Sequence, residues 1–225
     1  MKFLNGILAY VLLEFKLEFR SKFALASLLM YVLSTIYLVY FSLEYQALKA
    51  DLLPALWAVF FWLITLFTTV NATFRSFSKE GSSRMLFYYT LLDAKTFVLA
   101  KIFFNAIVSW VLSVVSALMF IVVLGNPIQN LGIFFLSLSI GTLGYSILFT
   151  YISAIAARSG ANASLSVILG FPLAIPLLTI IVKLFGESFK TIPSSNFDNN
   201  LWIALAFNFI PMLLSLVLFP YIWRD

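Results

Sequence analysis

Six long apolar stretches without a single Asp, Glu, Lys or Arg constrain this chain more than any other feature. They cover residues 23–41, 53–74, 102–124, 131–157, 164–182 and 201–219. At about 1.5 Å of rise per residue, each is long enough as a helix to cross a hydrocarbon layer of about 30 Å. Only 10% of the 225 residues are charged, whereas soluble domains carry about 25%. We therefore predict an all-α integral membrane protein with six transmembrane helices.

The basic residues are distributed unevenly over the segments that connect these stretches. Eleven of the fourteen Lys and Arg residues lie in residues 1–22, in segment 75–101, at Arg158 and at Arg224, which are all on one side of the predicted fold. The other three are Lys49, Lys183 and Lys190. Connections rich in Lys and Arg stay in the cytoplasm. We therefore expect both termini inside the cell.

Residues 1–22 are predicted to form an elbow helix that lies on the membrane surface before the first span. Leu8, Leu12, Phe15 and Phe19 recur at helical spacing and share one face. Charged residues flank this stripe on both sides, which is typical of a helix in the membrane interface. A simple extension of the first span is the alternative.

Segment 75–101 is the one sizeable polar interruption between the apolar stretches, and it is predicted to be a cytoplasmic loop. Residues 81–83 break the chain, and residues 84–89 can form about two turns of a coupling helix with large apolar side chains. Exposed apolar groups usually mark a contact surface, although packing against the membrane or under the spans would also explain them. The candidate docking residues are Glu80, Gly81, Arg84, Met85, Leu86 and Phe87.

The fifth apolar stretch contains Gly170, Pro172 and Pro176. Each proline removes a backbone donor and clashes with the preceding turn, so we predict a kink here. A hinge or a re-entrant break is the alternative. Small residues at three- and four-residue spacing in stretches 102–124 and 131–157 predict close helix packing, with a polar path for a substrate as the alternative.

The composition excludes several kinds of function. The chain has no Cys and no His, which removes disulfides, cysteine-held metals and the commonest ligands of metals and haem. With neither His nor a Lys expected inside a span, an intramembrane protease is disfavoured. A proton-driven transporter is disfavoured because the spans hold no acidic or basic residue. The net charge of +5 lies at the ends of apolar stretches and does not indicate nucleic-acid binding.

The chain is expected to be one membrane domain, residues 1–225, with a polar outer loop at 183–200. It contains no Gly-x-x-x-x-Gly-Lys-Ser/Thr sequence, which is the signature of a phosphate-binding loop. We therefore predict a non-catalytic subunit without a cofactor or metal of its own. Any active work would use ATP that a partner subunit hydrolyses.

Four short motifs resemble those of a known family of permeases. They are Lys79-Glu80-Gly81, Met85-Leu86-Phe87, Val98-Leu99-Ala100-Lys101 and Pro172-Leu173-Ala174-Ile175-Pro176. Together with the length and the expected topology, they resemble the permease subunits of ABC-2-type transporters and, more narrowly, the haem exporter protein B family, CcmB. The resemblance covers essentially the whole chain.

This resemblance implies a permease subunit, present as a dimer, in an ABC transporter complex for cytochrome c maturation in the bacterial inner membrane. It implies a cytoplasmic ATPase partner similar to CcmA, membrane partners similar to CcmC and CcmD, and a haem chaperone similar to CcmE that is released at the outer face. The complex would handle haem. Without His or Cys, we expect this chain to act mechanically. An ABC-2 exporter permease for a lipid, drug or polysaccharide is the alternative.

Overall fold

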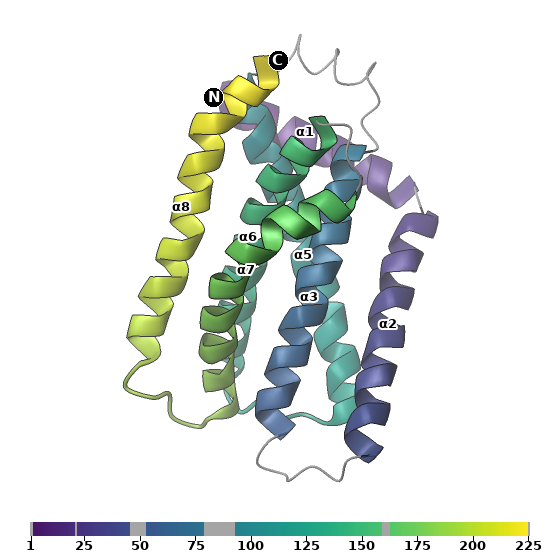
Figure 1. Ribbon diagram of the computed structural model, residues 1–225, viewed down its shortest axis with the longest axis vertical. Helices are drawn as coiled ribbons and strands as arrows, with labels where there is room; N and C mark the ends of the chain where they lie inside the picture. Colours follow the sequence, from purple (N-terminus) through teal and green to yellow (C-terminus); the bar gives the residue numbers. More distant parts are fainter. Residues whose placement is uncertain (1, 21, 46–52, 79–92, 159–162, 225) are drawn as a thin grey trace.

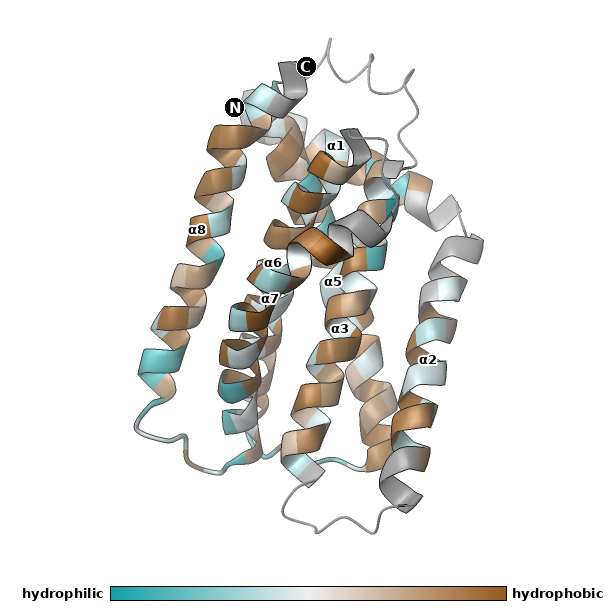
Figure 2. Ribbon diagram, viewed as in Figure 1, coloured by the Kyte–Doolittle hydropathy of each residue, from teal (hydrophilic) through white to brown (hydrophobic). Residues whose placement is uncertain are grey.

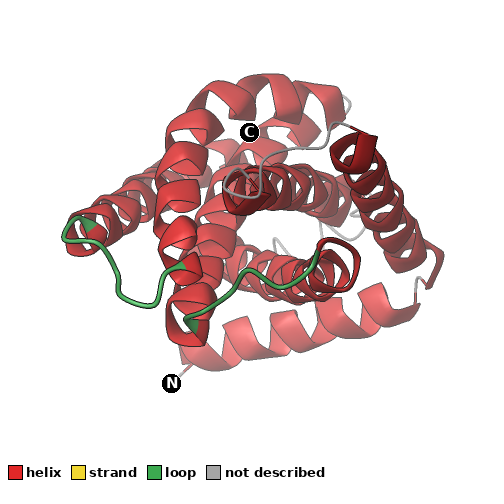
Figure 3. Ribbon diagram, turned by 90° about the horizontal axis from the view of Figure 1, so that it is seen from below, coloured by secondary structure: helices red, strands yellow, loops and turns green. Residues whose placement is uncertain are grey.

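The computed structural model describes residues 2–20, 22–45, 53–78, 93–158 and 163–224, and all regular structure among them is helical. Long helices stand side by side, and α1 (Lys2–Arg20) lies across one end of the bundle (Figures 1 and 3). The other long helices are α2 (Lys22–Tyr45), α3 (Leu53–Ser78), α5 (Ala94–Leu124), α6 (Leu131–Arg158), α7 (Ala163–Gly186) and α8 (Phe197–Arg224). A short 3-10 helix, η2 (Glu187–Phe189), follows α7.

Five of the described helices, α3, α5, α6, α7 and α8, are long and apolar enough to cross a membrane. Helix α2 adds a shorter apolar run, Leu29–Phe41. Figure 2 shows hydrophobic residues along the lengths of α3, α7 and α8, and hydrophilic residues in the connection between α7 and α8. Many large apolar side chains on the bundle surface are exposed, as lipid-facing side chains must be. The all-helical, multi-pass prediction is therefore confirmed.

Both termini lie at the same end of the bundle, which we call the termini end (Figure 1). Ser78 at the end of α3 and Ala94 at the start of α5 lie at this end too. The connections between α5 and α6 and between α7 and α8 lie at the opposite end. The two connections that the structure describes in full, between α5 and α6 and between α7 and α8, thus lie at the same end of the bundle.

The two helices that flank the predicted loop are longer than the sequence suggests. Helix α3 continues to Ser78 and α5 begins at Ala94, so both extend into segment 75–101. Phe97, Val98 and Ala100 are buried at the start of α5. Because this apolar face packs against the bundle, the helix begins before Lys101, on the N-terminal side of the uncharged stretch 102–124. The predicted docking residues, 80–87, lie outside the described residues.

Aromatic rings fill the core at the opposite end of the bundle. The ring of Phe61 stacks on Phe185 with 5.1 Å between centroids, and Trp57 meets the ring of Phe120 edge-on at 5.0 Å. All four side chains are buried. Such pairs add about 0.5–1.5 kcal/mol each beyond the burial of their surface. The rings tie the start of α3 to the ends of α5 and α7.

Glycines allow the helices to approach closely around α6. A Cβ atom at Gly141 would collide with the indole ring of Trp62, and one at Gly144 would collide with the amide oxygen of Asn208. The amide nitrogen of Asn208 donates a hydrogen bond to the carbonyl oxygen of Ile140 at 2.9 Å. These contacts support the packing interpretation of the small residues.

Hydroxyl groups inside the bundle are also used in packing. Thr65, Thr69 and Thr73 each donate a hydrogen bond to the carbonyl four residues earlier in α3. Between helices, the amide of Asn105 donates to the hydroxyl of Thr150 at 2.9 Å. These polar side chains thus bind to one another and to their own helices, as in ordinary packing between membrane helices.

Helix α7 passes through both of its prolines without interruption. Pro172 and Pro176 are exposed on its surface, and Gly170 lies against the ring of Phe149. The ribbon of α7 changes direction along its length, from an oblique first part to a steeper second part (Figure 1). The structure therefore has a bent helix here, not a re-entrant break.

We expect Gly141→Ala to lower the free energy of unfolding by about 1–3 kcal/mol, because the new methyl group would force apart Trp62 and α6. Gly132→Ala is the matched control on the same helix, since its Cβ would meet only the side chain of Asn130 at 3.4 Å. Unfolding of the purified protein in mixed micelles measures both changes. Equal stabilities of the two variants would contradict this packing.

Candidate functional site

A fully buried lysine joins three helices at the termini end of the bundle. Lys101 in α5 is 0% exposed. Its Nζ atom donates hydrogen bonds to the backbone oxygen and to the hydroxyl of Ser76 in α3, both at 2.8 Å. The same atom lies 3.7 Å from the carboxylate of Glu14 in α1. Three oxygen partners therefore surround one buried ammonium group.

Two aromatic rings complete this site. The Nζ atom of Lys101 lies 5.1 Å from the ring centroid of Phe77 and 5.8 Å from that of Tyr10. Both distances are within the range in which a cation is attracted to the face of a ring. We call Tyr10, Glu14, Ser76, Phe77 and Lys101 the Lys101 junction. Removing a charge from water is costly, and these partners offset that cost.

The Lys101 junction lies directly beside the predicted docking segment. Ser76 is in the last turn of α3, which ends at Ser78, and Lys101 is about two turns into α5, which begins at Ala94. The junction thus connects the two helices that lead into and out of residues 79–92. It also attaches both of them to α1. A displacement of α3 relative to α5 would have to strain or break these contacts.

An apolar cluster surrounds the Lys101 junction and extends it to two further helices. Phe97 packs edge-on against Tyr10 with 5.3 Å between ring centroids and stacks on Phe219 of α8 at 6.0 Å. Ile147 and Ala154 of α6 belong to the same cluster. The junction is therefore connected by packed side chains to α6 and α8.

A hydrogen-bonded Ser and Lys could in principle form a nucleophile and its base. That chemistry needs a neutral amine that accepts a proton. Here the Nζ atom of Lys101 donates to the carbonyl and the hydroxyl of Ser76 and lies beside the Glu14 carboxylate, so its contacts connect three helices. The geometry therefore supports a structural contact between helices.

The prediction that no lysine lies inside a span concerns residues 102–124, and Lys101 is the residue directly before them. The apolar helix Ala94–Leu124 includes Lys101. In the sequence, Tyr10 and Glu14 are four residues apart and share a face of α1 that is distinct from the leucine stripe. This pairing of a ring and a carboxylate is the signal that could have indicated a buried cation.

The elbow-helix residues divide between the bundle and its surroundings. Tyr10 and Glu14 are buried against the bundle, whereas Leu8 and Leu12 are 60% and 61% exposed. Phe15 is half-buried and meets the ring of Phe104 edge-on at 5.1 Å. The side chain of Phe19 lies outside the described residues. The exposed leucines form the kind of apolar face that an interfacial helix needs.

The predicted kink residues lie apart from the Lys101 junction. Gly170, Pro172 and Pro176 belong to α7, and none of them is in the apolar cluster around the junction. Helix α7 packs on α3 and α6. Helix α7 also packs on α8, so a link between the kink and the junction can run through α3, α6 or α8.

The family model described as CcmB protein matches residues 6–222 of the chain. The match includes α1, the Lys101 junction and all the helices that could cross a membrane. None of the curated proteins matches the chain.

We expect Lys101→Met to lower the free energy of unfolding by about 3–5 kcal/mol, because the Glu14 carboxylate would stay buried without its cation. The double variant Glu14→Gln/Lys101→Met should recover part of this loss, since it leaves no buried charge. Unfolding in mixed micelles gives both values and their coupling energy.

Lys95→Met is the control for this measurement. Lys95 is exposed, about two turns before Lys101 on the same helix, and its loss should change the free energy of unfolding by less than about 0.5 kcal/mol. If Lys101→Met were no more destabilising than Lys95→Met, the Lys101 junction would not hold the helices together.

Proposed function

The chain belongs to the CcmB protein family, and from this premise we propose that it converts movements of a partner ATPase into movements of its own membrane helices. The family is that of an ABC-type haem exporter permease for cytochrome c maturation. The finer proposal concerns how this subunit is coupled to its partners.

The Lys101 junction is the observation that carries this proposal. It holds the end of α3, the start of α5 and helix α1 together through one buried charge. Residues 79–92 connect α3 and α5. A partner that pushes on this segment would therefore move α1, α3 and α5 together, because the Lys101 junction connects these three helices.

We propose that the termini end faces the cytoplasm and that six helices span the membrane, with α2 as the first. Helix α2 has 24 residues, which is enough to cross a bilayer. The excess of Lys and Arg on the segments at the termini end supports this orientation. Helix α1, with Leu8 and Leu12 toward the lipid, would then lie in the cytoplasmic interface.

Residues Glu80, Gly81, Arg84, Met85, Leu86 and Phe87 are the proposed contact with a CcmA-like ATPase. ATP would be bound and hydrolysed there. CcmC- and CcmD-like membrane subunits, a CcmE-like chaperone and a second copy of this chain complete the proposed complex. With no Cys and no His in the sequence, the iron of haem would be held by another subunit.

Transmission to the outer face would follow α3 and α7. Helix α7 packs on α3 along the bundle, and it leads into η2 at the opposite end. The prolines of α7 remove backbone hydrogen bonds, which lowers the cost of bending at Pro172 and Pro176. We propose that this bend passes a displacement of α3 to the outer segment.

Leu86→Asp should abolish co-purification of the ATPase, because a carboxylate would be placed in an apolar contact. Ile192→Asp is the matched control: it replaces another aliphatic side chain by a carboxylate, at a residue that is 81% exposed at the opposite end, and it should leave recovery of the ATPase unchanged. Equal recovery with both variants would count against docking through residues 80–87.

The double variant Glu14→Gln/Lys101→Met separates docking from transmission. It removes the Lys101 junction without leaving a buried charge, so the protein should fold and still bind the ATPase. We expect cells that carry it to accumulate much less haem-stained cytochrome c than cells with the wild-type chain. Normal amounts of cytochrome c would show that force does not pass through the junction.

A further inference from the structure

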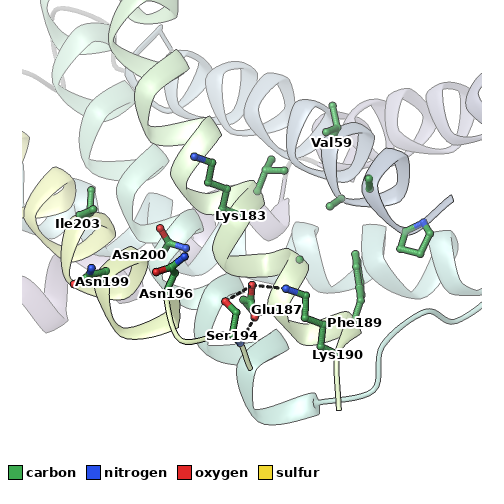
Figure 4. A pocket seen from close by; sticks show the side chains of 15 residues that line it. Val59, Lys183, Glu187, Phe189, Lys190, Ser194, Asn196, Asn199, Asn200 and Ile203 are labelled. Atoms are coloured by element: carbon green, nitrogen blue, oxygen red, sulfur yellow. Dashed lines mark hydrogen bonds and ion pairs between the residues drawn. The ribbon is translucent and has the colours of Figure 1, made fainter. Parts of the chain in front are cut away.

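A pocket with a volume of about 920 Å³ opens at the end of the bundle opposite the termini. It lies between the start of α3, the end of α7, η2 and the start of α8 (Figure 4). This volume is within the range of ordinary ligand-binding pockets, about 300–1,000 Å³. The pocket is far from the Lys101 junction, at the other end of the same helices.

One wall of the pocket is apolar and continues onto the surface of the bundle. Ala58 and Val59 of α3, Val182 of α7 and Ile203 of α8 contribute to it. Val59 and Ile203 are 37% and 44% exposed, so the wall reaches the surface that would face lipid. An alkyl chain could therefore extend from the pocket along these helices.

Polar side chains make up another part of the lining. Lys183 and the amides of Asn196, Asn199 and Asn200 contribute to it. Figure 4 shows the three asparagines on one side of the pocket together with Ile203, and Val59 on the other side. Each amide offers two N–H donors, and the lysine adds a positive charge. Such a lining suits a ligand that is anionic and rich in hydrogen-bond acceptors.

The one acidic residue in the lining is already neutralised within the protein. Glu187 is buried and accepts hydrogen bonds from Lys190 Nζ at 2.8 Å and from the backbone N–H and hydroxyl of Ser194 at 2.7 and 3.0 Å. Lys183, in contrast, forms no ion pair with the described residues. Among the residues that the structure describes, the pocket therefore carries one positive charge that no carboxylate offsets.

Gly186 leaves space in the floor of this pocket. A Cβ atom there would meet no heavy atom within 4 Å, and its φ of −60° allows any side chain. A larger residue at this position could therefore fill the pocket without distorting the helix.

We propose that this pocket binds one acidic phospholipid. Its phosphodiester would lie against Lys183 and the asparagine amides, and an acyl chain would follow Val59 and Ile203 into the bilayer. The single uncompensated charge matches the single negative charge of a phosphodiester. The position at the ends of the apolar helices is the depth at which headgroups lie. The proposal does not depend on the function proposed above.

Native mass spectrometry of the full-length protein in detergent tests this site, with phosphatidylglycerol and phosphatidylcholine as the probes. We expect the first phosphatidylglycerol to bind more tightly than phosphatidylcholine. Lys183→Gln should weaken that binding about fivefold, the effect of one basic residue near a membrane surface, and Lys183→Arg should retain it. Gly186→Leu, which keeps the charge but fills the pocket, should abolish it.

Lys95→Gln is the control, because Lys95 is an exposed lysine at the start of α5, away from this pocket. Equal binding of the two lipids, or equal affinity for phosphatidylglycerol in the Lys183→Gln and Lys95→Gln variants, would overturn the proposal. Displacement of the lipid by millimolar inorganic phosphate would also overturn it, since the pocket would then be a site for small anions. Failure of phosphate to compete supports a lipid that binds through both of its parts.

Discussion

The organisation of this protein depends on one buried ammonium group. Lys101 is fully buried, and Ser76 and Glu14 surround its ammonium group with oxygen atoms that offset the cost of removing it from water. Those partners come from α3 and α1, so keeping the charge satisfied requires three helices to stay in one arrangement. A hydrophobic contact of the same size would tolerate sliding, because dispersion forces have little direction. The ion pair therefore gives the termini end of the bundle a defined geometry.

The opposite half of the bundle is held by a different kind of force. Stacked rings and glycine contacts dominate there, as between Phe61 and Phe185 and between Trp62 and Gly141. These contacts are dense and largely apolar, with glycines where backbones come close. The molecule thus combines a polar, specific junction at one end with a tightly packed aromatic core at the other. This combination is consistent with the proposal that a partner acts on the termini end while the aromatic core at the opposite end stays packed.

The number and positions of the long helices could be predicted closely from the sequence, because runs without charged residues leave the backbone no alternative in lipid. The start of α5 agrees with Asp93 as a capping residue, whereas the end of α3 could not be predicted, because a hydropathy pattern stops at a charged residue. Lys101 looked like the end of a loop, yet the buried face formed by Phe97 and Ala100 continues through it. Its partner Glu14 is 87 positions away in the sequence, and only the folded chain brings the two together. The docking residues 80–87 remain a prediction from sequence.

The contact between Trp62 and Gly141 has a mechanical consequence for α3. If α3 is held fast where the indole meets the glycine, that point acts as a fulcrum. Ser76 lies about 21 Å along the helix on one side of it, and Pro54 lies about 12 Å along on the other. A sideways push near Ser76 would then reappear near Pro54 reversed and at roughly half its size. The short N-terminal part of α3 would then move against the pocket at the end opposite the termini.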